Sequence, residues 1–380
     1  MLRFNQLIKY HCLIRHINTG ISDSFGRQHT YLRISLTEKC NLRCQYCMPC
    51  DGIKLTEKKH LLTLEERKVL IELFYDTGFR KFRFTGGEPT ISNQLIKLIS
   101  YTNELHTNTK TTSTTNNNSN TTHANTTPTA TNPLTIGITT NGIMLINNTN
   151  YIKDLVTAGL TSINISLDTL SPTTYNTITR RNINNIIPKL LDLIYTCISY
   201  NIHVKINCVL LRGINTNISD IISFIELTRK LNIDIRFIEL MPFDGNQWNK
   251  EKFISYNQIL NDLYSNGYNI LPIPAPHIQP VPVPDSPSPL SVPDSYLSVS
   301  VPDSPMKSRE ENTVEVYDDN NNNNNILLPS MSSSSRKYDK SDTTKWYHMP
   351  GYIGRVGFIT TMTDHFCSKY ICVHMCVYMA

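Results

Sequence analysis

Three closely spaced cysteines near the start of the chain constrain its fold and chemistry more than any other feature. Cys40, Cys44 and Cys47 follow the spacing C-x3-C-x2-C. Iron–sulfur clusters are held by cysteine thiolates, usually four of them. Three thiolates leave one iron of a four-iron cubane without a protein ligand, so an outside molecule can bind there. The spacing therefore favours a cluster with one open coordination position.

Two other interpretations of the same cysteines stay open at this point. Cys50 supplies a fourth thiol, and four cysteines can hold a structural zinc ion. Zinc sites usually combine two separate cysteine pairs, however, and not four cysteines within eleven residues. A disulfide framework suits small secreted chains, and this chain is not short.

Length and composition leave room for a sizeable core. The chain has 380 residues, of which 39% are hydrophobic, and the low figure comes from two polar segments. The net charge of +5 is modest and suits an anionic small-molecule substrate without indicating nucleic-acid binding. No run of 18 apolar residues occurs, so we expect no membrane span.

Residues 1–22 are basic and amphipathic. They contain no Asp or Glu, and Arg3, Lys9 and Arg15 lie among leucines and isoleucines. This pattern is typical of an organelle transit peptide and predicts the mitochondrial matrix as the location. An ordinary frayed terminus of a cytoplasmic protein is the alternative.

Two segments have the composition of disordered insertions. Residues 105–132 form a Thr/Asn tract, and residues 271–345 carry Val-Pro-Asp-Ser repeats followed by Asn and Ser runs. Such segments bury too little apolar surface to repay the entropy of ordering. We therefore expect a core over residues 23–270, interrupted by the first insertion, and a C-terminal region over 346–380.

Apolar patterning within this core alternates between strand and helix. The expected strands are 31–36, 79–84, 134–140, 161–167, 203–210 and 233–240. The expected helices are 63–75, 91–101, 151–158, 186–200 and 218–231. Six such repeats predict an α/β fold with a parallel sheet, too small for a closed eight-stranded barrel and therefore a partial, open β/α barrel.

Polar motifs follow the carboxyl ends of these strands, where parallel barrels carry their active sites. They are the cysteine loop, Thr85-Gly86-Gly87-Glu88-Pro89, Thr139-Thr140-Asn141-Gly142 and Ser166-Leu167-Asp168. The cysteine spacing with an aromatic residue before the last cysteine, together with Gly-Gly-Glu-Pro after the second strand, resembles the radical S-adenosylmethionine superfamily. More narrowly, the chain resembles the GTP 3′,8-cyclase family of molybdenum cofactor biosynthesis over about residues 25–270, less the Thr/Asn tract, and again over 352–367.

The resemblance implies a [4Fe–4S] cluster on Cys40, Cys44 and Cys47 and S-adenosylmethionine as its outside ligand. It places four residues at that ligand: Tyr46, Gly87, Ser166 and Met241. Taken singly, three of these four have a simpler interpretation. The glycine pair suits a plain turn, Met241 a core position at a strand end, and Ser166 a capping hydroxyl.

The resemblance further implies GTP as substrate, held by Arg33, Arg83, Thr139 and Lys205. Arg and Lys are the side chains that pair with phosphate, and apolar neighbours on both sides place Arg83 and Lys205 on one face of a strand. From pattern alone, that face could equally be the outer, solvated one. No G-x-x-x-x-G-K-[ST] sequence occurs, so a nucleotide would not bind through a P-loop.

The C-terminus departs from the resembling family. A second [4Fe–4S] cluster needs a C-x2-C pair and a later cysteine, but here Cys367 is followed by Tyr370 at the second position. The family's arginines, its third cysteine position and its Gly-Gly terminus are also missing. Cys367, Cys372 and Cys376, in a C-x4-C-x3-C spacing, are the alternative source of three thiols. We expect Cys367 to be a remnant, and the chain to assemble the first cluster without completing GTP cyclisation. Iron and sulfide for two clusters would contradict this.

The resemblance implies several partners besides GTP: an electron donor, a second copy of the chain in a homodimer, and the next enzyme of the pathway, cyclic pyranopterin monophosphate synthase. Two rival functions remain. One is another radical S-adenosylmethionine enzyme, such as a peptide-maturing one. The other is a non-enzymatic zinc module on Cys40, Cys44, Cys47 and Cys50, which would stay colourless on reconstitution.

Overall fold

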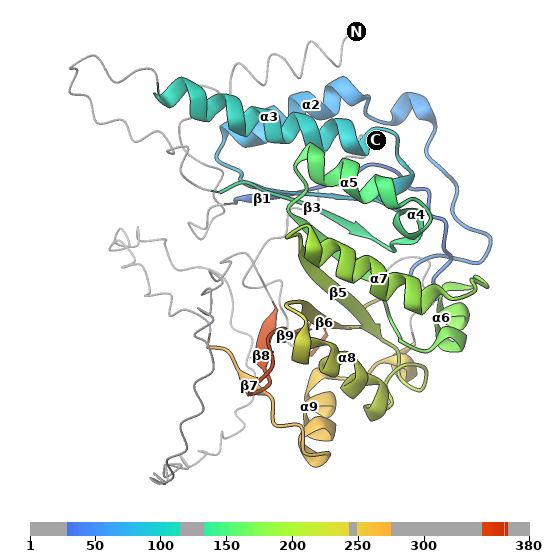
Figure 1. The fold of residues 1–380 in the computed structure, drawn as a ribbon. Coiled ribbons are helices and arrows are strands. Elements are labelled where there is room, and N and C mark those ends of the chain that lie inside the picture. The colour runs from blue at the N-terminus through green and yellow to red at the C-terminus, as the bar shows by residue number, and fades with distance from the viewer. Residues whose placement is uncertain (1–28, 115–132, 243–248, 275–343, 361, 364–380) are drawn as a thin grey trace, which may run out of the picture. The chain divides into compact units, whose positions relative to one another are not determined.

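The computed structural model describes residues 29–114, 133–242, 249–274, 344–360 and 362–363 (Figure 1). The chain divides into two units, and the second, residues 275–338, lies outside the described residues. The structure below belongs to the first unit, residues 1–274 with 339–380. None of its described helices is both long and apolar enough to cross a bilayer.

One mixed sheet of nine strands organises the described residues, in the order β1-β2-β3-β4-β5-β6-β9-β8-β7. The parallel strands are β1 (Tyr31–Ser35), β2 (Lys81–Thr85), β3 (Thr135–Thr140), β4 (Ser162–Ser166), β5 (His203–Leu210), β6 (Asp234–Glu239) and β9 (Arg355–Ile359). Antiparallel pairing adds β8 (Lys345–His348) and β7 (Leu271–Pro272). The six predicted strands are all present, and the sheet stays open, which confirms the predicted partial barrel.

Helices connect successive parallel strands. They are α2 (Leu64–Asp76), α3 (Leu95–Thr114), α4 (Ile143–Ile146), α5 (Thr149–Ala158), α6 (Pro172–Thr179), α7 (Ile186–Ser199), α8 (Ile218–Lys230) and α9 (Tyr256–Ser265). Short 3-10 turns are η1 (Lys58–His60), η2 (Pro89–Ile91) and η3 (Lys250–Lys252). A reciprocal capping box between Thr63 and Glu66 starts α2. All five predicted helices are found, whereas α4, α6 and α9 were not predicted.

The first polar tract begins later than predicted. Helix α3 continues to Thr114, ten residues into the segment expected to be disordered from 105. Its inner face supplies the reason, because Leu98, Ile99, Thr102 and His106 are buried against the rest of the unit. A helix that is already formed adds further polar residues at little cost. Residues 115–132 lie outside the described part of the chain.

The second polar tract is also shorter than predicted at both ends. The expected insertion of 271–345 includes Leu271–Pro272, which form β7, and Lys345, which begins β8. The two strands pair with each other, and β8 pairs with β9. Residues 346–359, expected to belong to a C-terminal remnant, therefore complete the core sheet.

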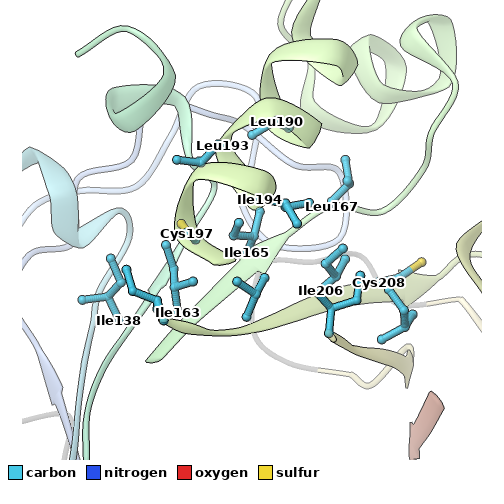
Figure 2. Packing of buried hydrophobic residues seen from close by; sticks show 14 of the residues in the cluster. Ile138, Ile163, Ile165, Leu167, Leu190, Leu193, Ile194, Cys197, Ile206 and Cys208 are labelled. Atoms are coloured by element: carbon cyan, nitrogen blue, oxygen red, sulfur yellow. The ribbon is translucent and has the colours of Figure 1, made fainter. Parts of the chain in front are cut away.

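One face of the sheet packs under the helices and forms the hydrophobic core. Figure 2 shows Leu190, Leu193, Ile194 and Cys197 of α7 above the strand residues. The strand residues beneath them are Ile138, Ile163, Ile165, Ile206 and Cys208, and Leu167, just after β4, lies beside Ile194. Nearly all are fully buried, so this layer fixes strands β3, β4 and β5 against their helices.

Successive side chains point to opposite faces of a strand. The residues between the core positions therefore lie on the opposite face of the parallel strands, and this face is polar. In β1, Leu32 and Ile34 are buried in the core, so Arg33 lies on the other side. Strand registers place residues from successive strands in rows across this polar face. One row holds Arg33, Arg83 and Gly137, and another holds Thr139, Asn164, Lys205, Asp234 and Arg355. The inward interpretation of the predicted cations is therefore the correct one.

Candidate functional site

The cysteine loop leaves β1 at the carboxyl end of the parallel strands and is held by distant backbone. Arg43 N–H donates to the Thr179 carbonyl at 3.0 Å, and Gln45 N–H donates to the Ile178 carbonyl at 2.9 Å. Both acceptors lie at the end of α6. Within the loop, Cys47 N–H closes a turn onto the Cys44 carbonyl at 2.9 Å. These bonds give the loop a defined conformation.

Two arginines after α6 hold the same loop with their side chains. Arg180 donates to the carbonyl oxygen of Met48 at 2.9 Å, and Arg181 donates to that of Asn41 at 3.1 Å. Arg180 has a left-handed backbone with φ of 52°. The crossover between β4 and α7 thus fixes a loop more than a hundred residues earlier. Sequence patterns did not indicate this role.

The three thiols are free and influence one another. Cys40 and Cys44 are half-buried, and Cys47 is exposed. Burial raises the pKa of all three, and the neighbouring thiols raise the pKa of Cys44 and Cys47 further. Closely spaced thiols that resist ionisation release protons when a metal binds, which then compensates their charge.

The donor set fits a cluster better than a single ion. Among the described residues, no group of three or more His, Cys, Asp or Glu side chains is arranged to hold one metal ion. In a cubane each thiolate binds a different iron, so the three sulfurs need not converge on one point. Cys50 is exposed three residues beyond Cys47. The zinc interpretation needs four convergent thiols, and no such group is found among the described residues.

Gly86 and Gly87 are required by the backbone of the cysteine loop. A Cβ on Gly86 would lie 2.4 Å from the Thr37 carbonyl oxygen, and one on Gly87 would lie 2.3 Å from that of Lys39. Gly87 N–H donates to the Thr37 oxygen at 2.6 Å. The pair is therefore more than a plain turn, because it lets the loop rest directly on the end of β2.

Glu88 joins three neighbouring strand ends and was not predicted as a site residue. Its carboxylate is buried and accepts hydrogen bonds from the Thr140 hydroxyl at 2.6 Å and the Asn141 N–H at 2.8 Å. Its backbone N–H donates to the Lys39 carbonyl at 2.8 Å. Asn141 in turn donates to Asn41 Oδ1 at 2.7 Å. An acid directly after two glycines was the available sequence clue.

Tyr46 is anchored by a second buried acid, Asp168. The Tyr46 hydroxyl donates to Asp168 Oδ2 at 2.8 Å, and Val209 N–H donates to Oδ1 at 2.9 Å. Burial raises the pKa of Asp168 to about 6, against the lowering effect of these two bonds. Asp168 thus connects the cysteine loop to the ends of β4 and β5.

Ser166 and Met241 lie at the same end of the sheet. Ser166 ends β4, and Met241 follows β6 by two residues. Met241 is 43% exposed, so its interpretation as a core residue is wrong. The interpretation of Ser166 as a strand-to-loop capping hydroxyl at the end of β4 stays a prediction. Both side chains are therefore placed at the open end.

Arg33 and Arg83 converge on one tyrosine. The Tyr31 hydroxyl accepts from Arg33 Nε at 3.0 Å and from Arg83 Nε at 2.8 Å. Arg83 also donates to the Ile138 carbonyl at 3.0 Å and is only 4% exposed. The two cations lower the pKa of Tyr31 against the effect of its burial. Two guanidinium groups thus stand side by side on the polar face.

Lys205 belongs to a group of charges around Asp234. Its ammonium lies 3.8 Å from Asp234 Oδ2, while Arg355 donates to both carboxylate oxygens at 3.0 and 2.9 Å. His203 Nε2 lies 2.8 Å from the same Oδ2. Basic partners outweigh burial and lower the pKa of Asp234. Lys205, Arg355 and His203 thus gather around one buried carboxylate.

A further cation on this face was not predicted. Arg236 donates to Asn207 Oδ1 at 3.0 Å through Nε and at 2.7 Å through Nη2. Thr139 shares the face on β3, three strands from β6, in register with Asn164. Cys367, the predicted remnant of a second cluster, lies outside the described residues.

An open β/α sheet that carries a three-cysteine loop at its strand ends defines an enzyme class, that of radical S-adenosylmethionine proteins. The family model described as Radical SAM superfamily matches residues 34–228. The chain belongs to this superfamily. Its relatives include GTP 3′,8-cyclase of Alkaliphilus oremlandii, 31% identical, with 91% of this chain and 78% of that protein covered.

Longer relatives match as well. Human Molybdenum cofactor biosynthesis protein 1 is 35% identical over 91% of this chain, and mitochondrial GTP 3′,8-cyclase of Arabidopsis thaliana is 40% identical over 64% of it. The chain spans 40% of the length of the human protein and 55% of that of the plant protein.

Solved structures resemble the chain only distantly. Streptococcus suis SuiB bound to its precursor peptide has a TM-score of 0.47 at 15% identity and covers 69% of this chain and 50% of its own. Methylornithine synthase has a TM-score of 0.42 at 15% identity, with 68% of this chain and 67% of its own covered. We infer nothing about function from these scores.

Proposed function

We propose that the chain is of the GTP 3′,8-cyclase type, whose reaction converts GTP to 3′,8-cyclo-7,8-dihydroguanosine 5′-triphosphate in molybdenum cofactor biosynthesis. Because Tyr370 stands in place of a second-cluster cysteine, we expect this chain to act on GTP without completing the cyclisation. The observation that carries this proposal is the set of cations on the polar face of the sheet, in two neighbouring rows. Arg33, Arg83 and Lys205 lie on the polar face of the sheet, opposite the core. The names of the relatives support the same substrate.

Cys40, Cys44 and Cys47 hold the [4Fe–4S] cluster, and the ends of β2, β4 and β6 receive S-adenosylmethionine. Tyr46, Gly87, Ser166 and Met241 surround this position at one end of the sheet. When bound and reduced, the cluster and S-adenosylmethionine would together supply a radical that removes a hydrogen atom from the substrate. The protein positions S-adenosylmethionine and the substrate for this step. Glu88 and Asp168 hold the cysteine loop in place for the cluster and for S-adenosylmethionine.

The triphosphate lies against the cations of the polar face. Arg33 and Arg83 present guanidinium groups that pair with phosphate oxygens, while Lys205 contributes a compact positive charge. Thr139 adds a hydroxyl on the same face. The buried Arg83 guanidinium has only neutral partners among the described residues. A buried cation is costly without an anionic partner, which makes the polar face a better fit to a triphosphate than to a neutral peptide.

The remaining parts of the proposal rest on relatives and sequence. We assign the chain to mitochondria, as the plant relative's name states for that protein. GTP, an electron donor, a homodimer partner and the next enzyme of the pathway are its proposed partners. Cys367 is proposed as a remnant, so the chain holds one cluster with about four irons.

The test is anaerobic incubation of reduced, reconstituted protein with S-adenosylmethionine, with and without GTP. We expect release of 5′-deoxyadenosine that depends on GTP and is lost when Cys40, Cys44 or Cys47 is replaced by Ala. Cys50→Ala is the matched control, because Cys50 is an exposed thiol in the same loop. Loss of the cluster in Cys50→Ala would indicate a four-cysteine site instead, and release without GTP dependence would contradict the cyclase.

A further inference from the structure

Asn164 carries a buried polar atom that nothing in the described protein satisfies. The residue is 3% exposed, and its Oδ1 has no hydrogen-bond partner among the described residues. A buried polar atom without a partner is unfavourable and is rare in folded proteins. Such an atom at the middle of a binding face points to a ligand that completes it.

The position of Asn164 is set by the strand and its neighbours. Ile163 and Ile165 are in the core, so Asn164 lies on the polar face of β4, together with Ser162 below it and Ser166 above it. Ser162 Oγ accepts a hydrogen bond from Arg83 Nη2 at 3.4 Å, so Ser162 lies on the same polar face of the sheet as Arg83.

Register places Asn164 between two proposed GTP ligands. Its partner on β3 is Thr139, and its partner on β5 is Lys205. Neighbouring strands lie about 4.8 Å apart, so these three side chains can contact one small molecule. Ser166, at the proposed S-adenosylmethionine position, is two residues further along β4, or roughly 7 Å. Asn164 therefore stands between the row of Arg33 and Arg83 and the reacting end of the sheet.

We propose that Asn164 positions the substrate by a hydrogen bond to a ribose hydroxyl. This inference rests on the proposed function, in which the ribose must lie next to S-adenosylmethionine while the phosphates reach the cations. A hydroxyl both donates and accepts, so it satisfies either end of the carboxamide. Asn164 is thus a residue that recognises the sugar, apart from the residues that neutralise the phosphates.

The experiment measures equilibrium binding of GTP, 2′-deoxy-GTP and 3′-deoxy-GTP to the reconstituted full chain and to Asn164→Ala. Wild type should bind one deoxy analogue at least tenfold more weakly than GTP. Asn164→Ala should lose this discrimination and bind GTP and that analogue equally. Asn257→Ala, at an exposed position of α9, is the control and should discriminate like wild type.

Two results would overturn the inference while leaving the proposed function intact. One is an Asn164→Ala variant that keeps the full discrimination. The other is an Asn164→Ala variant that binds all three nucleotides more weakly by the same factor. That result would indicate a general disturbance of the polar face, or a bound water as the partner of Asn164 Oδ1. Thermal unfolding of each variant confirms that it is folded. Absence of GTP binding to wild type would instead overturn the proposed function and this inference together.

Discussion

The Tyr46 hydroxyl donates a 2.8 Å hydrogen bond to Asp168, across 122 residues of sequence. Tyr46 lies between two cluster cysteines, and Asp168 lies just beyond the end of β4. The bond therefore ties the cysteine loop to the sheet at the point where cluster and substrate must meet.

Tyr46→Phe should destabilise the protein by about 1–3 kcal/mol, because it leaves a buried carboxyl with one donor fewer. Unfolding in denaturant measures this change. A double-mutant cycle with Asp168→Asn should show a coupling of about 1 kcal/mol or more. Tyr175→Phe is the control, since the buried Tyr175 hydroxyl has no partner among the described residues. An equal loss of unfolding free energy in both Phe variants would contradict a stabilising role for the Tyr46–Asp168 hydrogen bond.

Asp168 should also make stability depend on pH. Its pKa is raised from 3.8 to about 6 by burial, so the folded state keeps a proton that the unfolded chain has lost. The stability from this group is complete below pH 3.8 and is lost as the pH rises through about 6. Relative to Asp168→Asn, wild type should lose about 1 kcal/mol between about pH 5 and pH 7. A parallel pH dependence in both proteins would contradict this.

The buried carboxylate of Asp234 should contribute far more to the free energy of unfolding than an acid in a surface ion pair. Asp234→Asn removes the buried partner of Arg355 and Lys205 and should cost about 3–5 kcal/mol. Glu57→Gln is the control, because Glu57 pairs with Lys59 at the surface and its replacement should cost less than about 1 kcal/mol. Denaturant unfolding ranks the two, and comparable losses would be inconsistent with a buried charge group.

Gly87→Ala should prevent the cysteine loop from seating, because its Cβ would lie 2.3 Å from the Lys39 carbonyl oxygen. We expect loss of most bound iron after reconstitution. Gly213→Ala tests the specificity of this effect, since Gly213 has positive φ but open space around its Cβ position. That control should lower stability by about 1 kcal/mol and retain its iron. Iron retained at the wild-type level in Gly87→Ala would contradict the packing role.

The sequence predicts local features of this fold well and long-range partners poorly. Alternating apolar runs locate β1 to β6, because a half-buried strand leaves a periodic pattern. Strand β9 was missed, since five residues paired with β6 from beyond a long polar segment leave no local pattern. Glu88, Asp168 and Arg236 were missed as site residues for a related reason. Each is a single charge whose importance comes from burial and from partners on other strands.

The cysteine loop was predictable because its ligands are adjacent in sequence. The residues that hold the loop were not predictable, because Thr179, Arg180 and Arg181 hydrogen-bond to it from a different crossover. The inward direction of Arg33 and Lys205 followed from alternation only once the register showed which face holds the core.

Transfer of deuterium tests the central claim most directly. Reduced, reconstituted protein is incubated with S-adenosylmethionine and GTP deuterated at C3′, and the 5′-deoxyadenosine is analysed by mass spectrometry. A GTP 3′,8-cyclase should place deuterium from C3′ into 5′-deoxyadenosine, and replacement of Cys44 by Ala should abolish the product. Formation of unlabelled 5′-deoxyadenosine at the same rate with and without GTP would contradict the assignment.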